Sequence, residues 1–284
     1  MSRYRTFTLL GLILAALTLL GLCVQRWRLT AHPSEMGTVI AEEHPRAEQA
    51  LRRALTALEP ARLPWLRHEV HQCVQAKGLN FTAEGAYARG PDYRLRLDLR
   101  VRSHGTSARL AMWCDGRILW RVDQAGSAPP ALATMELVQL RDTPSAPSGQ
   151  TPPPETFFHS HLYAGIVPLL HDLRQQLVFI DCEADQWQER AVWALTGIWK
   201  TPPSEPAWLG FTPRCCRLFL DEQTYWPYRV EWWGPLTPAT ADVLLMWMEF
   251  RDPVPGRPLP DHFFTYHPDD YALTAPIPHP PLTP

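Results

Sequence analysis

The stretch YRLRLDLRVR, residues 93–102, decides the class of the fold. Apolar residues occupy every odd position, from Tyr93 to Val101, and charged residues occupy every even position, from Arg94 to Arg102. Successive side chains of a β-strand point to opposite faces, so this alternation predicts a strand with one face toward an apolar core and the other toward water. A strand with one wet face is typical of an antiparallel sheet.

Neighbouring segments repeat the alternation and predict consecutive hairpins. Residues 81–87 alternate in the same way, and residues 110–114 lead into Asp115-Gly116, after which the alternating residues 118–122 return. Asp-Gly between two alternating runs is typical of a tight hairpin, because its turn requires positive φ angles. Consecutive hairpins predict an antiparallel meander. Further strands are predicted at residues 177–183, 190–199, 214–221, 225–233 and 243–250.

Two segments of helical character interrupt the strands. Pro45 opens a stretch, residues 46–58, whose apolar residues recur with the i, i+3, i+4, i+7 spacing of an amphipathic helix. The pattern of residues 157–177 predicts one or two short helices, interrupted at Pro168. We interpret the proline-rich stretch 143–154 as a loop inside one domain, not as a domain linker. The fold class is therefore mainly β with a few helices.

The N-terminus carries a hydrophobic segment. Residues 7–24 contain no charge and are flanked by arginines on both sides. At the helical rise of about 1.5 Å per residue, such a segment covers about 27 Å, which is enough for the hydrocarbon layer and longer than the apolar part of most signal peptides. A cleaved signal peptide is the alternative, but no pair of small residues stands at a suitable cleavage position. We expect residues 1–28 to form a transmembrane signal anchor and residues 29–44 to form a spacer.

The sequence contains no motif of a familiar catalytic or metal site. G-x-S-x-G, the Walker loop, G-x-G-x-x-G and H-E-x-x-H are all absent. The histidine clusters are His159-x-His161 and His68-x-x-His71, and neither spacing places both rings on one face of the element expected there. We therefore expect no enzyme, no cofactor and no metal ion.

Charge and cysteine content limit the partners. The net charge of −2 provides no general attraction to nucleic acid, so no nucleic-acid partner is expected. The six cysteines include no C-x-x-C pair, which disfavours zinc ribbons and thioredoxin-type redox chemistry. A disulfide among Cys73, Cys114 and Cys182 is left open by the sequence.

Several segments, in their order along the chain, resemble the outer-membrane lipoprotein-sorting, or LolA-like, superfamily. They are the helix 46–58, the strand pair 81–89 and 94–102, the hairpin DGRILW (115–120), LFLD (218–221) through Thr224 to PYRVE (227–231), and MEFRD (248–252) through LPD (259–261) to FFTY (263–266). Together they cover most of residues 46–268.

This resemblance implies a curved antiparallel half-barrel, closed on its concave side by helices, that accommodates lipid or lipoprotein acyl chains in the periplasm without catalysis. The domain would span residues 45–268, followed by a proline-rich tail at 269–284. The retained N-terminal helix departs from soluble carriers and favours an inner-membrane-anchored carrier or sensor with its main domain in the periplasm. Envelope proteins are expected as further partners.

The alternation also identifies candidate residues for the apolar concave face. If Leu95, Leu97 and Leu99 face the concavity, the same parity brings eight other residues to that face. The candidate ligand-binding residues are Phe81, Tyr87, Leu95, Leu97, Leu99, Leu110, Met112, Ile118, Trp120, Trp226 and Trp232. Alternation does not separate a sealed core from a wall that a ligand reaches. An envelope scaffold with the same fold and a self-filled cavity is therefore the alternative function.

Overall fold

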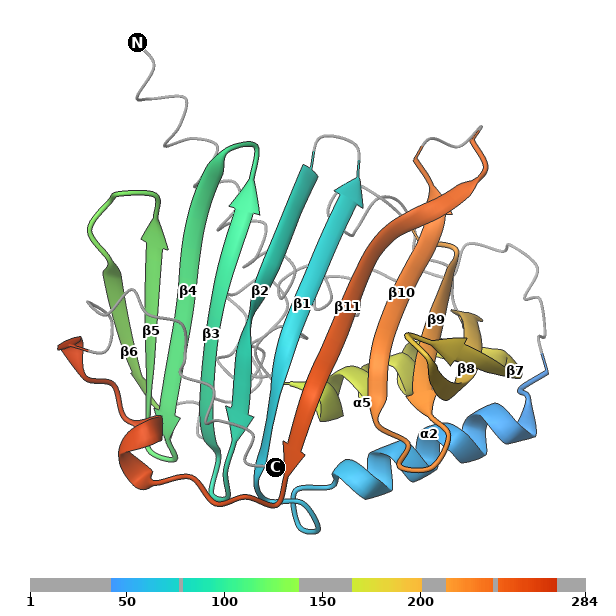
Figure 1. The fold of residues 1–284 in the computed structure, drawn as a ribbon, viewed down its shortest axis with the longest axis horizontal. Helices are drawn as coiled ribbons and strands as arrows, with labels where there is room; N and C mark the ends of the chain where they lie inside the picture. The colour runs from blue at the N-terminus through green and yellow to red at the C-terminus, as the bar shows by residue number, and fades with distance from the viewer. Residues whose placement is uncertain (1–41, 77–78, 138–164, 201–212, 237–239, 270–284) are drawn as a thin grey trace, which may run out of the picture.

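The computed structural model shows a single antiparallel sheet of eleven strands in the part of the chain that it describes (Figure 1). The described residues are 42–76, 79–137, 165–200, 213–236 and 240–269. The strands are β1 (Leu66–Ala76), β2 (Leu79–Arg89), β3 (Arg94–Ser103), β4 (Thr106–Asp115), β5 (Ile118–Ala125), β6 (Ala131–Glu136), β7 (Leu177–Trp187), β8 (Arg190–Trp199), β9 (Cys215–Asp221), β10 (Pro227–Pro235) and β11 (Asp242–Pro255).

Two meanders make up this sheet. The strand order is β6-β5-β4-β3-β2-β1-β11-β10-β9-β8-β7, so β1 to β6 form one half and β7 to β11 the other. The halves meet where β1 pairs with β11, with Val70 opposite Phe250 and Gln72 opposite Met248. The first and last strands of the chain therefore lie side by side at the centre of the sheet.

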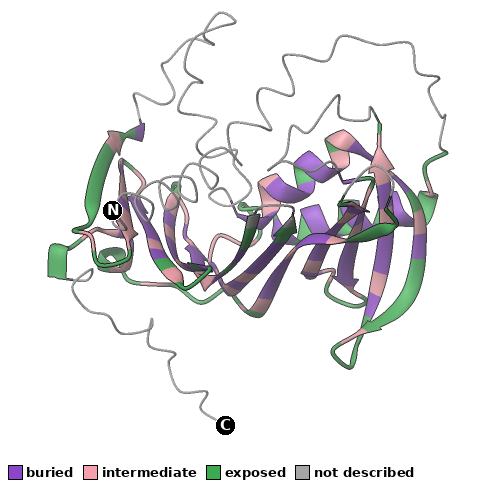
Figure 2. Cartoon of the chain, turned by 90° about the horizontal axis from the view of Figure 1, so that it is seen from above, coloured by how far each residue is buried: buried purple, intermediate pink, exposed green. Residues whose placement is uncertain are grey.

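The sheet curves around two helices, α2 (Pro45–Leu58) and α5 (Ile166–Gln176), which lie on its concave side (Figure 2). The expected curved antiparallel half-barrel with helices on its concave side is confirmed. The predicted membrane helix lies outside the described residues, as do the spacer up to residue 41, the loop at 143–154 and the tail beyond residue 269. Among the described helices, none combines the length and the apolar character that crossing a membrane requires.

An ion-pair cluster joins the two helices. The Glu48 carboxylate of α2 accepts hydrogen bonds from Arg52 Nε at 2.8 Å and from Arg174 Nη2 of α5 at 2.5 Å. Burial alone would raise the pKa of Glu48, but these two guanidinium groups outweigh it and hold the pKa below its usual value. At the other end of α2, Arg89 Nη2 on β2 donates to the carbonyl oxygens of Leu58 and Leu63. The helix is thereby attached to the sheet at its C-terminal end.

The structure changes the predicted elements at three places. Pro168 does not interrupt a helix, because it lies in the first turn of α5, where no helical hydrogen bond requires its missing N–H. Tyr93 precedes β3 in a turn with φ of 63° and is 65% exposed, so it is not part of the apolar face. Strands β1 and β6 were not predicted from the sequence.

A short helix covers part of the outer, convex face. The 3-10 helix η1 (Asp261–Phe264) follows β11, and Arg96 Nη1 of β3 donates to the carbonyl oxygen of Phe263 at 3.2 Å. The Tyr266 ring packs edge-on against Trp113 at 5.3 Å between centroids. The C-terminal segment therefore buries the outer face of β3 and β4.

Gly85 allows β2 and β3 to approach closely. A Cβ atom at this position would lie 1.8 Å from the carbonyl oxygen of Asp98. We expect Gly85→Ala to lower the free energy of unfolding by about 1–3 kcal/mol, because the two backbones must separate. At Gly197 the nearest atoms are side-chain ends of Leu177 and Phe179 at 3.1 Å, so Gly197→Ala should cost less. Equal losses in urea denaturation would contradict this explanation.

Candidate ligand-binding face

The concave face carries one large apolar cluster, which contains buried residues of α2, of α5 and of ten of the eleven strands. We call it the concave cluster. It includes Leu51 of α2, Leu169 of α5, Leu195 of β8 and Met246 of β11. Nine of the candidate residues belong to it: Phe81, Tyr87, Leu95, Leu97, Leu99, Leu110, Met112, Trp226 and Trp232. Residues that lie far apart in the sequence therefore share one apolar surface.

The other two candidates, Ile118 and Trp120, lie on the opposite face. Cys114 pairs with Leu119 and Trp113 pairs with Trp120, so even-numbered residues of β4 lie opposite odd-numbered residues of β5. Because directly paired residues point to the same face, the parity changes at the Asp115-Gly116 turn. The expectation that both residues face the concavity is therefore wrong.

Trp120 instead belongs to an outer cluster. It packs against Ala111, Trp113 and Val122 on the convex side, together with Tyr266. On β5 the concave positions are Leu119, Arg121 and Asp123, and the last two form an ion pair at 2.8 Å. The sequence argument missed these two charged residues because it assigned them to the wet face.

The concave cluster is closed in this structure. The nine candidate residues within it are between 0% and 6% exposed. Apart from Phe81, which also lines the cavity at the strand tips, a ligand reaches them only if the atoms that cover them move aside.

A histidine lies inside this apolar face. His68 of β1 stacks on Tyr87 of β2 at 5.0 Å between centroids, and the rings of Trp226 and Phe250 meet it edge-on at 5.5 and 5.6 Å. Its Nδ1 donates to the carbonyl oxygen of Glu69 at 3.1 Å, and its Nε2 is buried and has no hydrogen-bond partner in the part of the chain that the structure describes. Burial lowers the pKa of His68 to about 4, with a smaller contribution from the positive charge of Arg89. The ring is therefore neutral at pH 7.

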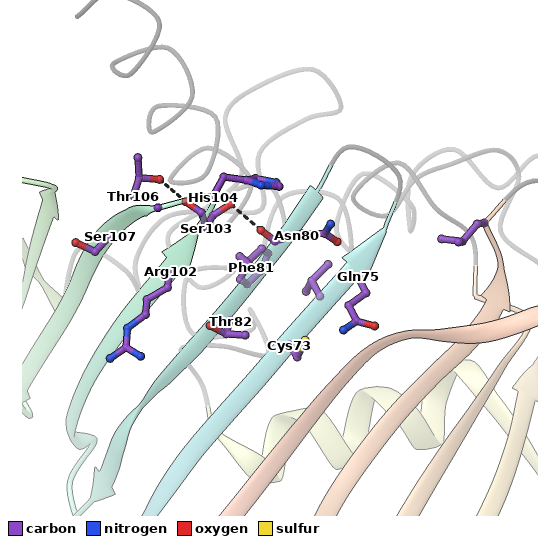
Figure 3. A pocket seen from close by; sticks show the side chains of 13 residues that line it. Cys73, Gln75, Asn80, Phe81, Thr82, Arg102, Ser103, His104, Thr106 and Ser107 are labelled. Carbon is purple, nitrogen blue, oxygen red and sulfur yellow. Dashed lines mark hydrogen bonds between the residues drawn. The ribbon is translucent and has the colours of Figure 1, made fainter.

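A cavity of about 1060 Å³ opens at the tips of β1 to β4 (Figure 3). Phe81 and Val74 of the concave cluster line it, and so does Leu236 beyond β10. Its rim is polar and ordered by short hydrogen bonds, from Ser103 Oγ to the Asn80 carbonyl oxygen and from Thr106 Oγ1 to the Ser103 carbonyl oxygen, both at 2.6 Å. Phe81 is the one candidate residue that lines this cavity.

Metal-ligating and redox groups do not gather at this face. Within the described ranges, no three His, Cys, Asp or Glu side chains lie close enough to hold a metal ion. His68 lies on the concave face and His71 on the convex face, where it contacts Glu69 at 3.3 Å. The five cysteines that the structure describes are free thiols, including Cys73, Cys114 and Cys182. Burial raises the pKa of the Cys114 thiol to about 11, which leaves it unreactive at neutral pH.

No protein-family model matches this chain, and no curated protein sequence matches it. Similar solved structures exist. One is the structure of MucB, whose sequence is 13% identical to this one. The match covers 79% of this chain and 64% of the MucB chain, with a TM-score of 0.39. The complex of MucA and MucB from Pseudomonas aeruginosa is 15% identical, covers 78% of this chain and 61% of its own, and has a TM-score of 0.33. This chain therefore spans less than two thirds of the length of MucB.

A further similar structure is the LolA superfamily protein NE2245 from Nitrosomonas europaea, which is 15% identical, covers 79% of this chain and 98% of its own, and has a TM-score of 0.25. At these identities and scores the likeness concerns the fold alone. The chain is similar in fold to LolA-superfamily proteins, the family that its sequence resembles.

Proposed function

We propose that this protein is a non-enzymatic, membrane-tethered component of the bacterial envelope whose half-barrel binds the acyl chains of a lipid or lipoprotein. Residues 1–28 would anchor it in the inner membrane, and the domain at 45–268 would lie in the periplasm and act as a carrier or sensor.

The continuous apolar concave face is the observation that supports this proposal. Leu66 of β1, Leu97 of β3, Leu119 of β5, Leu195 of β8 and Val230 of β10 all contribute to the same cluster. Sites for apolar ligands are concave, mostly apolar and carry a few placed polar groups. The cavity at the strand tips is slightly larger than the usual size range of about 300–1,000 Å³, and Phe81 and Val74 belong both to its lining and to the cluster.

The closed state of the cluster favours a second candidate function. If the side chains fill the interior permanently, the same fold would act as an envelope scaffold that binds another protein. The exposure of 0–6% at the nine concave candidate residues supports this reading. The two functions differ in one measurable property, the uptake of acyl chains.

Native mass spectrometry with lipid extraction tests the proposal on the domain from residue 29, purified from its own envelope. We expect lipid to co-purify in near-stoichiometric amounts, and the delipidated domain to take up a fluorescent fatty acid. Leu97→Asn should weaken uptake about tenfold, because it removes apolar contact from the face. Trp120→Gln on the convex face is the matched control and should leave uptake unchanged.

Two results would contradict acyl-chain binding. One is an empty protein that also refuses added fatty acid, which would support the scaffold. The other is unchanged uptake in Leu97→Asn, which would show that the probe binds elsewhere. Near-UV circular dichroism of each variant confirms that its tertiary structure is intact.

A further inference from the structure

Gln72 is a buried amide inside the apolar concave face. It lies on β1 opposite Ala83 of β2 and Met248 of β11, and it is 1% exposed. Its Nε2 points to the sulfur of Met246 at 3.9 Å, and its Oε1 has no hydrogen-bond partner among the described residues. Sulfur accepts but does not donate here, so this orientation of the amide leaves the carbonyl oxygen as the unsatisfied atom.

An unsatisfied amide is costly in such surroundings. Burying a polar atom without a partner destabilises a protein by about 1–3 kcal/mol, and an apolar residue of similar shape avoids this loss. The neighbours on both sides of Gln72 along the concave face of β1 are Val70 and Val74, which are apolar. A polar side chain at this position calls for a partner, and the described residues of the chain do not provide one.

The position of Gln72 relates it to the cavity at the strand tips. Val74 and Phe81 are paired across β1 and β2 and line the cavity, and Gln72 and Ala83 form the next pair that faces the same side. Successive residues on the same face of a strand, such as Val74 and Gln72, are about 7 Å apart. Beyond Ala83 the next position of β2 with the same parity is Gly85, which lies opposite Val70, so the residue directly beside Gln72 on β2 is the small Ala83.

The row of concave residues on β1 that starts at Val74 ends at the aromatic cluster around His68. From Val74 to His68 the strand extends for about 20 Å. The row of concave residues on β1 therefore begins at the polar rim of the cavity, includes the unsatisfied amide of Gln72 beside Ala83, and ends at His68 between the rings of Tyr87 and Trp226. The row is buried, so a ligand enters it only when the side chains that cover it move aside.

We infer that Gln72 binds the amide linkage of an N-acyl chain whose hydrocarbon tail lies along Ala83 and Gly85 toward His68. The unpaired Oε1 accepts the N–H of the linkage, and the second hydrogen of Nε2 donates to its carbonyl oxygen. An ester-linked chain has no N–H and leaves Oε1 unsatisfied. This inference rests on the proposed acyl-chain binding and adds the class of linkage that the site selects.

Photo-crosslinking of the full chain in lipid nanodiscs tests the inference. The probes are three diazirine-bearing chains of equal length: an N-acyl amino acid, a monoacylglycerol and an alkane. We expect the N-acyl probe to label β1 and β2 about tenfold more than the monoacylglycerol, which corresponds to one hydrogen bond to a buried amide. In Gln72→Met both acyl probes should label equally, and the alkane should label this variant as well as the wild type.

Two further variants make the result unambiguous. Gln72→Met should raise the melting temperature, because it removes an unsatisfied buried group, so reduced labelling does not reflect unfolding. Gln72→Leu is a second apolar replacement if methionine packs poorly. Gln186→Met, on the exposed part of the edge strand β7, is the matched control and should leave all labelling unchanged.

The outcomes separate the two levels of the proposal. Equal labelling by the N-acyl and ester probes in the wild type, or a preference that survives in Gln72→Met, overturns the role of Gln72 and leaves acyl-chain binding intact. Labelling of β1 and β2 by none of the probes overturns the proposed function as well.

Discussion

Replacing Glu249 by alanine is expected to lower the free energy of unfolding by about 3 kcal/mol, because it leaves two arginines without their shared partner. Glu249 lies on the convex face of β11 and is 2% exposed. Its two carboxylate oxygens accept hydrogen bonds from Arg229 of β10 and from Arg251. Arg229 also donates to Glu231 at 2.6 Å. The chain of charges connects β10 to β11 beside the central pair of strands.

An exposed ion pair on the same face provides the control. Arg102 and Glu84 meet at 2.7 Å, with side chains 64% and 45% exposed. Exposed pairs stabilise proteins by about 0–1 kcal/mol, so Glu84→Ala should have little effect. In Glu249→Met combined with Arg229→Met, part of the lost stability should return, because this variant also removes the Arg229 charge, which keeps only Glu231 as a partner when Glu249 is absent. Urea denaturation measures all four proteins, and equal losses for Glu249→Ala and Glu84→Ala would contradict the explanation.

Acid is expected to destabilise the protein through His68. The pKa of this ring is about 4 in the folded protein because it is buried, and about 6.5 in the unfolded chain. Between these two pH values the unfolded chain binds a proton that the folded protein does not bind. The stabilisation from the neutral ring is therefore complete above about pH 6.5 and is lost as the pH falls toward 4, by about 3 kcal/mol in total.

Comparison with His68→Phe isolates this contribution. Phenylalanine keeps a ring between Tyr87, Trp226 and Phe250 but does not titrate. Carboxylates titrate in both proteins, so the difference between their free energies of unfolding reports on His68 alone. We expect this difference to change by about 3 kcal/mol between pH 7 and pH 4. Parallel curves for the two proteins would show that His68 has no part in acid unfolding.

Most strands of the sheet could be predicted because their alternation is clear. The segment at 94–102 became β3 and that at 190–199 became β8, with the bounds almost unchanged. Strand β6 could not be predicted, since it is an edge strand with mostly exposed side chains on both faces and has no alternation to detect. The helix at 46–58 was recognisable because one face carries all its buried residues.

Strand β1 was missed for a reason that also concerns function. Its concave positions are Leu66, His68, Val70, Gln72 and Val74, so two polar residues break the apolar pattern. A search for alternation that allowed some of the core-facing positions to be polar would have found the strand. These two residues, His68 and Gln72, are also the unusual ones in the structure. His68 lies within an aromatic cluster, and Gln72 carries the unsatisfied amide.

The sequence by itself determined which strands have an apolar face, that α2 is amphipathic, and that consecutive strands form an antiparallel meander, because these properties depend on local periodicity. The curved half-barrel was expected only from the resemblance to the LolA-like superfamily. Only the tertiary structure decided which residues share a face across a turn. Trp120 was assigned to the concave face, but odd-numbered residues of β4 pair with even-numbered residues of β5, which places Trp120 beside Trp113 on the convex side. Pairing between strands depends on turn geometry and on contacts between distant segments, such as β1 with β11, and periodicity within one strand contains no information about either.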